Sequence, residues 1–447
     1  MTAPLDRLDL ARHLVQRAGF AETPGRVVRT AEFRHEDAVD ALLDPPARLA
    51  DAPLPGWVDR APLSYRTIRA AFEGEEPKRR AARALTRAER ALIADLRARW
   101  LAALIRTDDP LGARMTLLWQ NRFTSGHRKV RHAALLARQQ VTLSRLALAP
   151  LDELVGAMLT DPAMLLYLDA NRNRRTRPNE NLARELLELF TLGEGHYAER
   201  DVRETARALT GLSVDDALDF RFRPEAHDPG DKTILGTTGP FFGVAPIVEA
   251  ILAGPAAARR VADAFWRHFV SPEPDAGTVE DWARGYRDSG HDTRALVRRV
   301  LTSEAFVDPA HRGLLVKSPI EYVVGGHRAL GLPPSEGATL VRACATMRQT
   351  PWEPPNVAGW PGGTAWINGQ TLLARERFVN RLVRDDAIDR TGLEAGLDPA
   401  ALAATLVPNA ALAGTLGNAR LERAASRDRP GGFPVAALLG SPLWHLA

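Results

Sequence analysis

The segment RRAARALTRAERALIADLRARWLAALI, residues 79–105, decides the fold class. Its larger apolar side chains recur every three or four residues, which places them along one side of a helix. The side chains on this stripe are Leu85, Ala88, Leu92, Leu96, Trp100 and Leu104. Because no glycine or proline interrupts the period, the stretch predicts one long helix.

Helical spacing of this kind recurs along most of the chain, for example over residues 5–18, 129–147 and 256–270. A chain of 447 residues that is 45% hydrophobic can bury a large core, and no clear linker divides it. We therefore predict a mainly α protein, folded as one large helical domain over residues 1–447. Its C-terminal tail, 397–447, is rich in Ala and Leu and is also predicted to be helical.

Two stretches depart from the helical pattern. Apolar and charged residues alternate over 220–223, a Pro-Gly turn follows near residue 229, and 232–242 is rich in Gly and Thr. This pattern predicts one β-hairpin near residues 218–242. The other stretch, 349–368, holds three tryptophans and four prolines and predicts a long loop. Loops of this length inside compact domains are often functional.

Composition excludes several classes of protein. The single cysteine, Cys344, rules out an intramolecular disulfide framework and a thiolate-rich zinc or iron–sulfur site. Charged residues interrupt every apolar run near the N-terminus, and no run is long enough to cross a membrane. We expect a cytoplasmic protein without an integral membrane segment.

The basic residues are unevenly distributed. Between residues 78 and 131 there are fourteen basic and four acidic residues, whereas the whole chain carries a net charge of +4. A solvated helix side explains this surplus most simply. A face that binds phosphates, an acidic partner or an anionic membrane surface is the alternative. Binding to nucleic acid is disfavoured because the usual motifs are absent.

The segment PNENLARELLELF, residues 178–190, carries a polar stripe at helical spacing that includes Arg184, Glu185 and Glu188. Two carboxylates one turn apart could divide acid and base roles or bind a metal. In that interpretation Glu185 is catalytic and Arg184 binds substrate. The spacing alone favours an ordinary amphipathic helix with an Arg184–Glu188 ion pair on its solvated side.

The turn of the predicted hairpin holds a second candidate site. His227 and Asp228 could act as catalytic groups there, with Lys232 binding an anionic substrate. The simpler interpretation is that Asp228 caps its own turn and that His227 has no catalytic role.

Other motifs narrow the choice of cofactor. A single Glu-x-x-His at residues 32–35 is too little for a di-iron site, and zincin, nucleophile-elbow and P-loop motifs are absent. The sequence therefore identifies no nucleotide, haem or iron–sulfur cofactor, and a divalent metal on Glu and His ligands stays open. In the loop 349–368, Asn356, Trp360 and Trp366 are candidate substrate-binding residues, because tryptophan faces can pack on sugars or cations. They could equally serve only to hold the loop on the helices.

Several segments together resemble one bacterial family, domain of unknown function 1800, over about residues 10–385. The segments are RAGF at 17–20, WQNRFTSG at 119–126, PNENLARELLELFTLGEGHY at 178–197, DVRETARALTG at 201–211, HDPGDKTILG at 227–236 and PPNVAGWPGG at 354–363.

The resemblance implies no established reaction. It implies a partner protein, because members are often encoded beside a family similar to phosphatases and sulfatases. That family commonly carries an export signal, so the resemblance gives export together with this signal-bearing partner as the alternative localisation. Members usually read Trp-His-Asn-His-Phe where this chain has Gln120 and Arg122, so a metal site on those histidines is in doubt here. His127 is close enough in sequence to compensate. The family's polar segments also suggest that Asn121 binds substrate and that Glu185 and His227 share a pocket.

Two functions follow as expectations. The first is an enzyme whose Glu/His/Arg pocket acts on a carbohydrate or phosphate-like substrate by hydrolysis or transfer. The second is a non-enzymatic helical adaptor that binds a phosphatase- or sulfatase-like partner through the basic stretch 78–131 and the Trp-rich loop.

Overall fold

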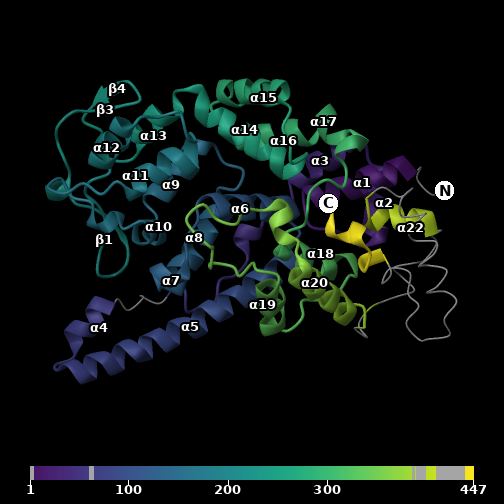
Figure 1. Cartoon of the computed structure of the whole chain (residues 1–447), viewed down its shortest axis with the longest axis horizontal. Coiled ribbons are helices and arrows are strands. Elements are labelled where there is room, and N and C mark those ends of the chain that lie inside the picture. Colours follow the sequence, from purple (N-terminus) through teal and green to yellow (C-terminus); the bar gives the residue numbers. More distant parts are fainter. Residues whose placement is uncertain (1–4, 60–64, 385–387, 389–398, 409–437) are drawn as a thin grey trace.

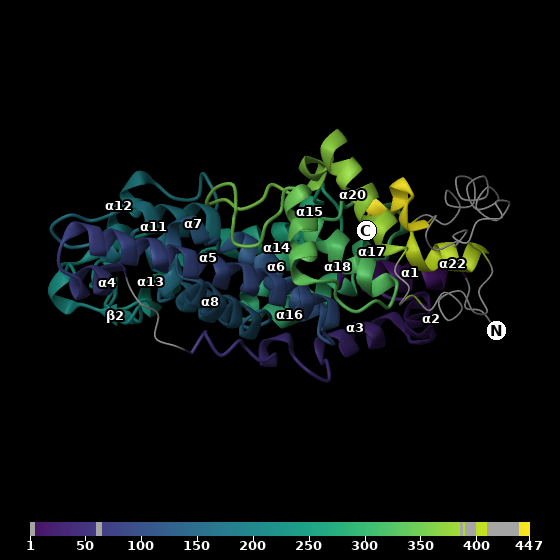
Figure 2. The same ribbon diagram turned by 90° about the horizontal axis from the view of Figure 1, so that it is seen from below.

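The computed structural model describes residues 5–59, 65–384, 388, 399–408 and 438–447. Within these ranges helices dominate and strands are few and short, so the predicted mainly α fold class is confirmed (Figure 1). The molecule is elongated, and the long helix α5 (Glu75–Arg106) runs along one edge of it (Figures 1 and 2).

The N-terminal half of the chain contains these further helices: α1 (Leu5–Arg17), α2 (Pro24–Glu32), α3 (His35–Leu43), α4 (Tyr65–Ala71), α6 (Pro110–Arg122), α7 (His127–Val130), α8 (Ala133–Arg145), α9 (Leu151–Leu159), α10 (Pro162–Tyr167), α11 (Asn181–Glu185) and α12 (Glu199–Ala208). The C-terminal half contains α13 (Ala245–Leu252), α14 (Pro255–Phe269), α15 (Ala276–Asp288), α16 (Thr293–Leu301), α17 (Glu304–Val307), α18 (Pro319–Ala329), α19 (Gly337–Thr346), α20 (Gly369–Leu382) and α22 (Pro399–Leu406).

The long predicted helix exists, but only part of its apolar stripe is buried. From Glu89 onward, side chains such as Leu96 and Trp100 are buried, whereas none of residues 75–88 is. The N-terminal half of α5 extends with α4 away from the other helices (Figure 1). The hydrophobic period therefore predicts the helix correctly and overstates its packing.

Two large hydrophobic clusters hold the helices together. One surrounds α9 and α13–α16, and the other surrounds α5, α18 and α19. Helices α6 and α8 contribute to both clusters, and the buried Trp119 of α6 donates from Nε1 to the Ala147 carbonyl at 2.9 Å. The two clusters thus meet at a shared pair of helices. The single-domain interpretation of residues 1–447 stays a prediction.

The hairpin prediction for residues 218–242 is wrong in its pairing. Strand β2 (Phe220–Phe222) pairs with the preceding β1 (Leu212–Val214), and β3 (Lys232–Ile234) pairs with β4 (Thr237–Gly239). Both turn residues between β3 and β4 have positive φ, 49° at Leu235 and 87° at Gly236. A two-residue turn of this type matches the twist of a hairpin. Asn, Asp or Gly usually occupies the first position of such a turn, and leucine does not indicate one, so the sequence did not predict this hairpin.

The other irregular segment agrees with expectation. Residues 349–368, between α19 and α20, form a loop with one short 3-10 turn at Gly363–Trp366. Of the predicted helical tail, the structure describes α22 and a 3-10 turn at Pro442–His445. The tail residues 397–398 and 409–437 lie outside the described residues. In the described ranges, no helix combines the length and the hydropathy that crossing a bilayer would need.

Asp161 caps α10 inside the protein, and this cap predicts a pH-dependent stability. Its Oδ1 accepts from the Met164 amide at 2.8 Å and from Gln139 Nε2 at 2.7 Å, yet burial raises the pKa of the carboxyl to about 7. The native state therefore binds a proton between pH 4 and 7 that the unfolded chain has released, so stability falls as pH rises through this window.

Asp161→Asn keeps the accepting oxygen and removes this titration. We expect the variant to gain up to about 4 kcal/mol of unfolding free energy relative to the wild type between pH 4 and pH 8. Urea denaturation at several pH values measures this difference. A difference that does not change with pH would contradict the raised pKa.

Candidate functional site

A cavity of about 800 Å³ lies at the centre of the molecule, where segments far apart in the sequence meet. Its wall is built from the end of α1, the last turns of α6, one face of α14, the start of α18 and the loop 349–368. We call it the central cavity. Four of the segments that carry the family resemblance reach its wall, through Arg17, Gln120–Arg122, Leu189 and residues 358–363.

Helix α6 supplies one wall through its helical period. Asp109 caps it by accepting from the Gly112 amide, and Pro110 occupies its first turn. Arg114, Leu117, Leu118 and Asn121 then follow at spacings of three and four residues and line the cavity together. The wall is completed by Gln120 and Arg122, which occupy the positions where the family resemblance leads one to expect histidines.

Helix α14 supplies the opposite wall. Its apolar face, which includes Val261, Phe265 and Phe269, is buried in the core. The other face presents the polar residues Arg260, Asp263, Arg267 and His268 to the cavity. The apolar period of residues 256–270 predicts this helix. The polar residues recur at helical spacing too, which places them on one face, but nothing in the spacing says that this face lines a cavity.

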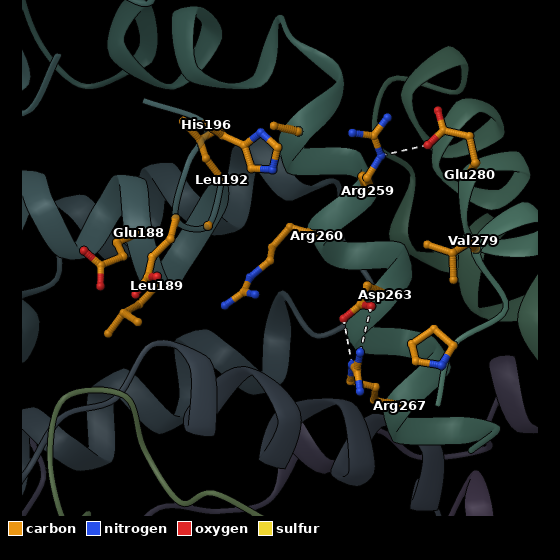
Figure 3. A pocket seen from close by; sticks show the side chains of 15 residues that line it. Glu188, Leu189, Leu192, His196, Arg259, Arg260, Asp263, Arg267, Val279 and Glu280 are labelled. Carbon is orange, nitrogen blue, oxygen red and sulfur yellow. Dashed lines mark hydrogen bonds and ion pairs between the residues drawn. The ribbon is translucent and has the colours of Figure 1, made fainter. Parts of the chain in front are cut away.

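A groove of about 720 Å³ adjoins the central cavity on the other side of Arg260. Leu189, Arg260, Asp263 and Arg267 line both spaces. In Figure 3 the Arg260 side chain extends into the open space between Glu188 and Asp263, and Asp263 pairs with Arg267. The cavity and the groove thus lie next to each other, and Arg260 is one of the residues that line both.

The central cavity carries excess positive charge. Five arginines line it together with two side-chain carboxylates, Asp263 and Glu321. Each carboxylate is already paired, Asp263 with Arg267 at 2.9 Å and Glu321 with Arg114. In the described part of the chain, the remaining arginines of the wall have no carboxylate partner: Arg17, Arg122 and Arg260.

Arg122 and Arg260 are close enough to repel each other. Burial lowers the pKa of Arg122 to about 10, and the charge of Arg260 is the next cause. Both guanidinium groups are still cationic at neutral pH. One nitrogen of Arg122, Nη1, is buried without a hydrogen-bond partner in the described structure. Two like charges held together in this way create a favourable position for an anion.

Five basic residues near the cavity are buried: Arg12, Arg17, Arg114, Lys317 and Arg375. Two of them, Arg17 and Arg114, also line it. Lys317 donates to the Trp444 carbonyl at 3.0 Å and lies 3.5 Å from the centre of that tryptophan ring. Burial lowers the pKa of Lys317 well below its usual range, and the four arginines lower it further. Among described carboxylates, only Asp9 and Glu321 pair with any of the five residues.

His268 is the titratable ring in the cavity wall. Its Nε2 is buried and has no hydrogen-bond partner in the described structure. Burial lowers its pKa well below the usual value, and the charges of Arg114 and Arg17 lower it further. The imidazole is therefore neutral at pH 7, which leaves it able to accept a proton.

The loop 349–368 closes the cavity because Asn121 holds it. Asn121 Oδ1 accepts from the Trp360 amide at 2.8 Å, and Nδ2 donates to the Trp360 carbonyl at 3.2 Å. Gly359 has φ 78°, and a Cβ there would meet the Asn121 carbonyl oxygen at 2.5 Å, so only glycine fits. Asn121, predicted to bind substrate, thus lies in the cavity wall and also positions the loop.

The other predicted loop residues differ in their placement. Trp360 lines the central cavity, and the buried Trp366 lies in the same wall. Asn356 is exposed and accepts from the Ala358 amide within its own turn, outside this wall.

Arg184 and Glu185 lie away from the central cavity. Arg184 pairs with Glu199 at 2.8 Å and with Glu180 at 3.3 Å, so the suggested Arg184–Glu188 pair is wrong. The reason is a π-helical turn, Leu186–Thr191, that follows Glu185 and changes the rotation per residue. Glu188 consequently lies in the lining of the groove of about 720 Å³ that adjoins the central cavity (Figure 3).

Glu185 itself is half-buried. Burial raises the pKa of its carboxyl, and the neighbouring Glu188 raises it further. Burial raises the pKa of Tyr167, and the charge of Glu185 raises it further. Its predicted catalytic role stays a prediction.

His227, Asp228 and Lys232 form a separate structural unit. The buried ring of His227 contacts the Thr210 carbonyl through Nδ1 at 2.9 Å and packs between Phe222 and Phe242. Asp228 accepts from the Gly230 amide at 3.0 Å, as the turn-capping interpretation predicts, and from Arg207 Nε at 2.8 Å.

The buried Lys232 donates to the carbonyls of Asp228 and Pro240 and so ties this turn to β4. None of His227, Asp228 and Lys232 lines the central cavity, and the structure does not bring His227 and Glu185 together there. The catalytic and substrate-binding roles of these residues stay predictions from sequence.

No group of three or more His, Cys, Asp or Glu side chains in the described part of the chain is arranged to hold a metal ion. The charged and titratable residues of the central cavity that the sequence did not single out are mostly arginines, together with His268. Arginines are so frequent in this chain that their number alone did not single out any of them.

The comparisons with known proteins agree with the sequence resemblance. Neither the curated proteins nor the solved structures include a significant match. The family described as "Protein of unknown function (DUF1800)" matches residues 13–445, which is nearly the whole chain. The protein therefore belongs to the DUF1800 family.

Proposed function

We propose that the central cavity binds a small molecule that carries a phosphate group, and that the chain acts on this molecule by hydrolysis or transfer. One observation supports the proposal above all. Arg122 of α6 and Arg260 of α14 line the same cavity without a carboxylate partner among the described residues, and each repels the other. Bound phosphate would relieve that repulsion.

The chemistry of the wall favours phosphate. Arginine presents a planar fork of N–H donors that matches two phosphate oxygens at once. Arg17, a buried arginine that also lines the cavity, raises the positive potential further. Leu118, Leu315 and Trp360 add apolar surface, which suits a less polar portion of the ligand such as a sugar ring.

His268 supports the catalytic part of the proposal. A neutral imidazole beside a bound phosphate ester can accept a proton from the attacking group. This role belongs to the cavity itself, unlike the role that the sequence suggested for His227.

A titration with inorganic phosphate tests the binding part, monitored through the nitrogen NMR signals of the imidazole groups. Without phosphate, we expect the His268 ring to be neutral down to acidic pH, because burial and nearby arginines lower its pKa. Bound phosphate should raise this pKa, since the anion stabilises the imidazolium ion. The signals of His227, which lies outside the cavity, serve as the internal control.

A His268 signal that does not respond to phosphate would contradict the proposal. A response shared equally by His227 would indicate a general effect of ions and would contradict it as well.

A further inference from the structure

The N-terminal half of α5 is a helix without a core to support it. None of the side chains of residues 75–88 is buried, and of the described elements only α4 accompanies this half of the helix (Figure 1). Helices in proteins are usually stabilised by packing one apolar face against a core. A stable helix that is polar on all sides commonly connects two domains or is stabilised by many ion pairs along its surface. We call residues 78–90 the basic arm.

The arginines of the basic arm are unpaired within the part of the chain that the structure describes. Arg80, Arg83, Arg87 and Arg90 are exposed, and none of them forms an ion pair with a carboxylate that the structure describes.

The other half of the same helix is different. Arg97 pairs there with Glu353 at 2.7 Å, and Arg99 pairs with Asp95 at 2.8 Å. Of the three arginines in this half, only Arg106 has no ion pair with a described carboxylate, whereas no arginine of the arm has such a pair.

The spacing of these residues makes the arm unfavourable by itself. Arg83 and Arg87 are four residues apart, and Arg80 and Arg90 lie three residues from their neighbours in this series. Like charges at these spacings repel across a helix turn and destabilise the helix. A partner with several carboxylates would convert each repulsion into an attraction.

The arm also forms one side of a groove of about 1170 Å³. Arg69 of α4 and Arg131 contribute to its lining, so six arginines face one acidic residue, Glu76. The remaining lining residues are Ala82 and Thr86. We propose that this groove binds an acidic segment of a partner protein, rich in Asp and Glu.

The lining favours an acidic polypeptide over the other polyanions. Channels for single-stranded nucleic acid combine basic residues with aromatic side chains that stack on bases, and the described lining residues include no aromatic one. Helices that bind membrane surfaces insert large apolar side chains, and no lining residue that the structure describes has one. The planar guanidinium group of arginine can donate two parallel hydrogen bonds to one carboxylate, which suits the side chains of Asp and Glu.

The experiment compares three probes by fluorescence at low and physiological salt. The probes are a labelled peptide of alternating Asp and Glu, a single-stranded thymidine oligonucleotide of equal charge, and vesicles that contain phosphatidylserine. We expect the wild-type protein to bind the peptide most tightly and to lose affinity as salt is added.

The triple variant Arg80→Glu, Arg83→Glu, Arg87→Glu should weaken peptide binding about tenfold or more. A matched control reverses three exposed arginines elsewhere, Arg48→Glu, Arg106→Glu and Arg381→Glu, with the same change in net charge. The control should keep affinity within about twofold. Circular dichroism checks whether charge reversal lowers the helix content of the protein. If it does, a second variant with glutamine at the same three positions removes the charges without reversing them and is compared in its place.

Three results would overturn the proposal. They are no binding of the peptide by the wild type, equal losses in the arm and control variants, and tighter binding of the oligonucleotide or the vesicles. The phosphate site is tested independently, because the arm residues do not line the central cavity.

Discussion

Arg122→Met is expected to weaken phosphate binding about a hundredfold and to leave the fold as stable as before, or more stable. The guanidinium group of Arg122 can make two charge-assisted hydrogen bonds to phosphate, each of about 1.5–3 kcal/mol, and methionine can make none. Loss of about 3 kcal/mol corresponds to the expected change in affinity. Isothermal titration calorimetry with inorganic phosphate measures it.

The expected effect on stability has the opposite sign. Without a ligand, Arg122 is repelled by Arg260, and its Nη1 is buried without a partner in the described structure. Replacing a buried charge with an apolar side chain of similar length is often neutral or stabilising. We therefore expect the unfolding free energy to stay constant or to rise by about 1 kcal/mol. If Arg122 had only a structural role, its replacement would lower the unfolding free energy. Weaker phosphate binding at unchanged stability therefore indicates a role in binding.

Arg298→Met is the matched control. Arg298 of α16 is partly exposed, pairs with Asp40 at 2.7 Å and does not line the central cavity. The control should leave phosphate affinity unchanged. If Arg122→Met also binds phosphate like the wild type, the central cavity is not the phosphate site.

Asn121→Ala is expected to release the loop 349–368 from α6. The substitution removes both hydrogen bonds to the backbone of Trp360, and each is worth about 1 kcal/mol. Local opening should then become about tenfold or more frequent, since the loop loses its hydrogen-bonded anchor on α6. Limited proteolysis should cut the chain within residues 356–363 correspondingly faster.

The same variant should also weaken phosphate binding, because Trp360 and residues 361–364 form one wall of the central cavity. Asn356→Ala is the control in the same loop, since this exposed side chain contacts only its own turn among the described residues. Equal cleavage rates in the two variants would show that Asn121 does not anchor the loop.

Local sequence predicted the helices well because their signals are local. The apolar period of residues 79–105 identified α5, and the Asp161-Pro162 pair marks the start of α10. The strand pairing could not be predicted in the same way. The hairpin β3–β4 depends on positive φ at Leu235, a conformation that leucine rarely adopts and that the sequence pattern does not announce.

The candidate site shows the same division. Sequence pointed to the loop around Trp360 and to Asn121, and both lie in the wall of the central cavity. It also pointed to His227 and Lys232, which the fold uses to stabilise a turn. Polarity within a turn does not reveal whether the side chain faces a ligand or the backbone beside it.

The sequence by itself determined that this protein is mainly α, where its irregular segments lie and that it has an uneven basic surplus. Only the tertiary structure decided which arginines pair with carboxylates and which do not. Arg17, Arg122 and Arg260 come from three distant segments, and their lack of counter-charge depends on where the two hydrophobic clusters place α1, α6 and α14. The sequence gives the charge of each residue. Whether an opposite charge lies close enough to pair with it depends on distances in space, which the packing of the folded core sets.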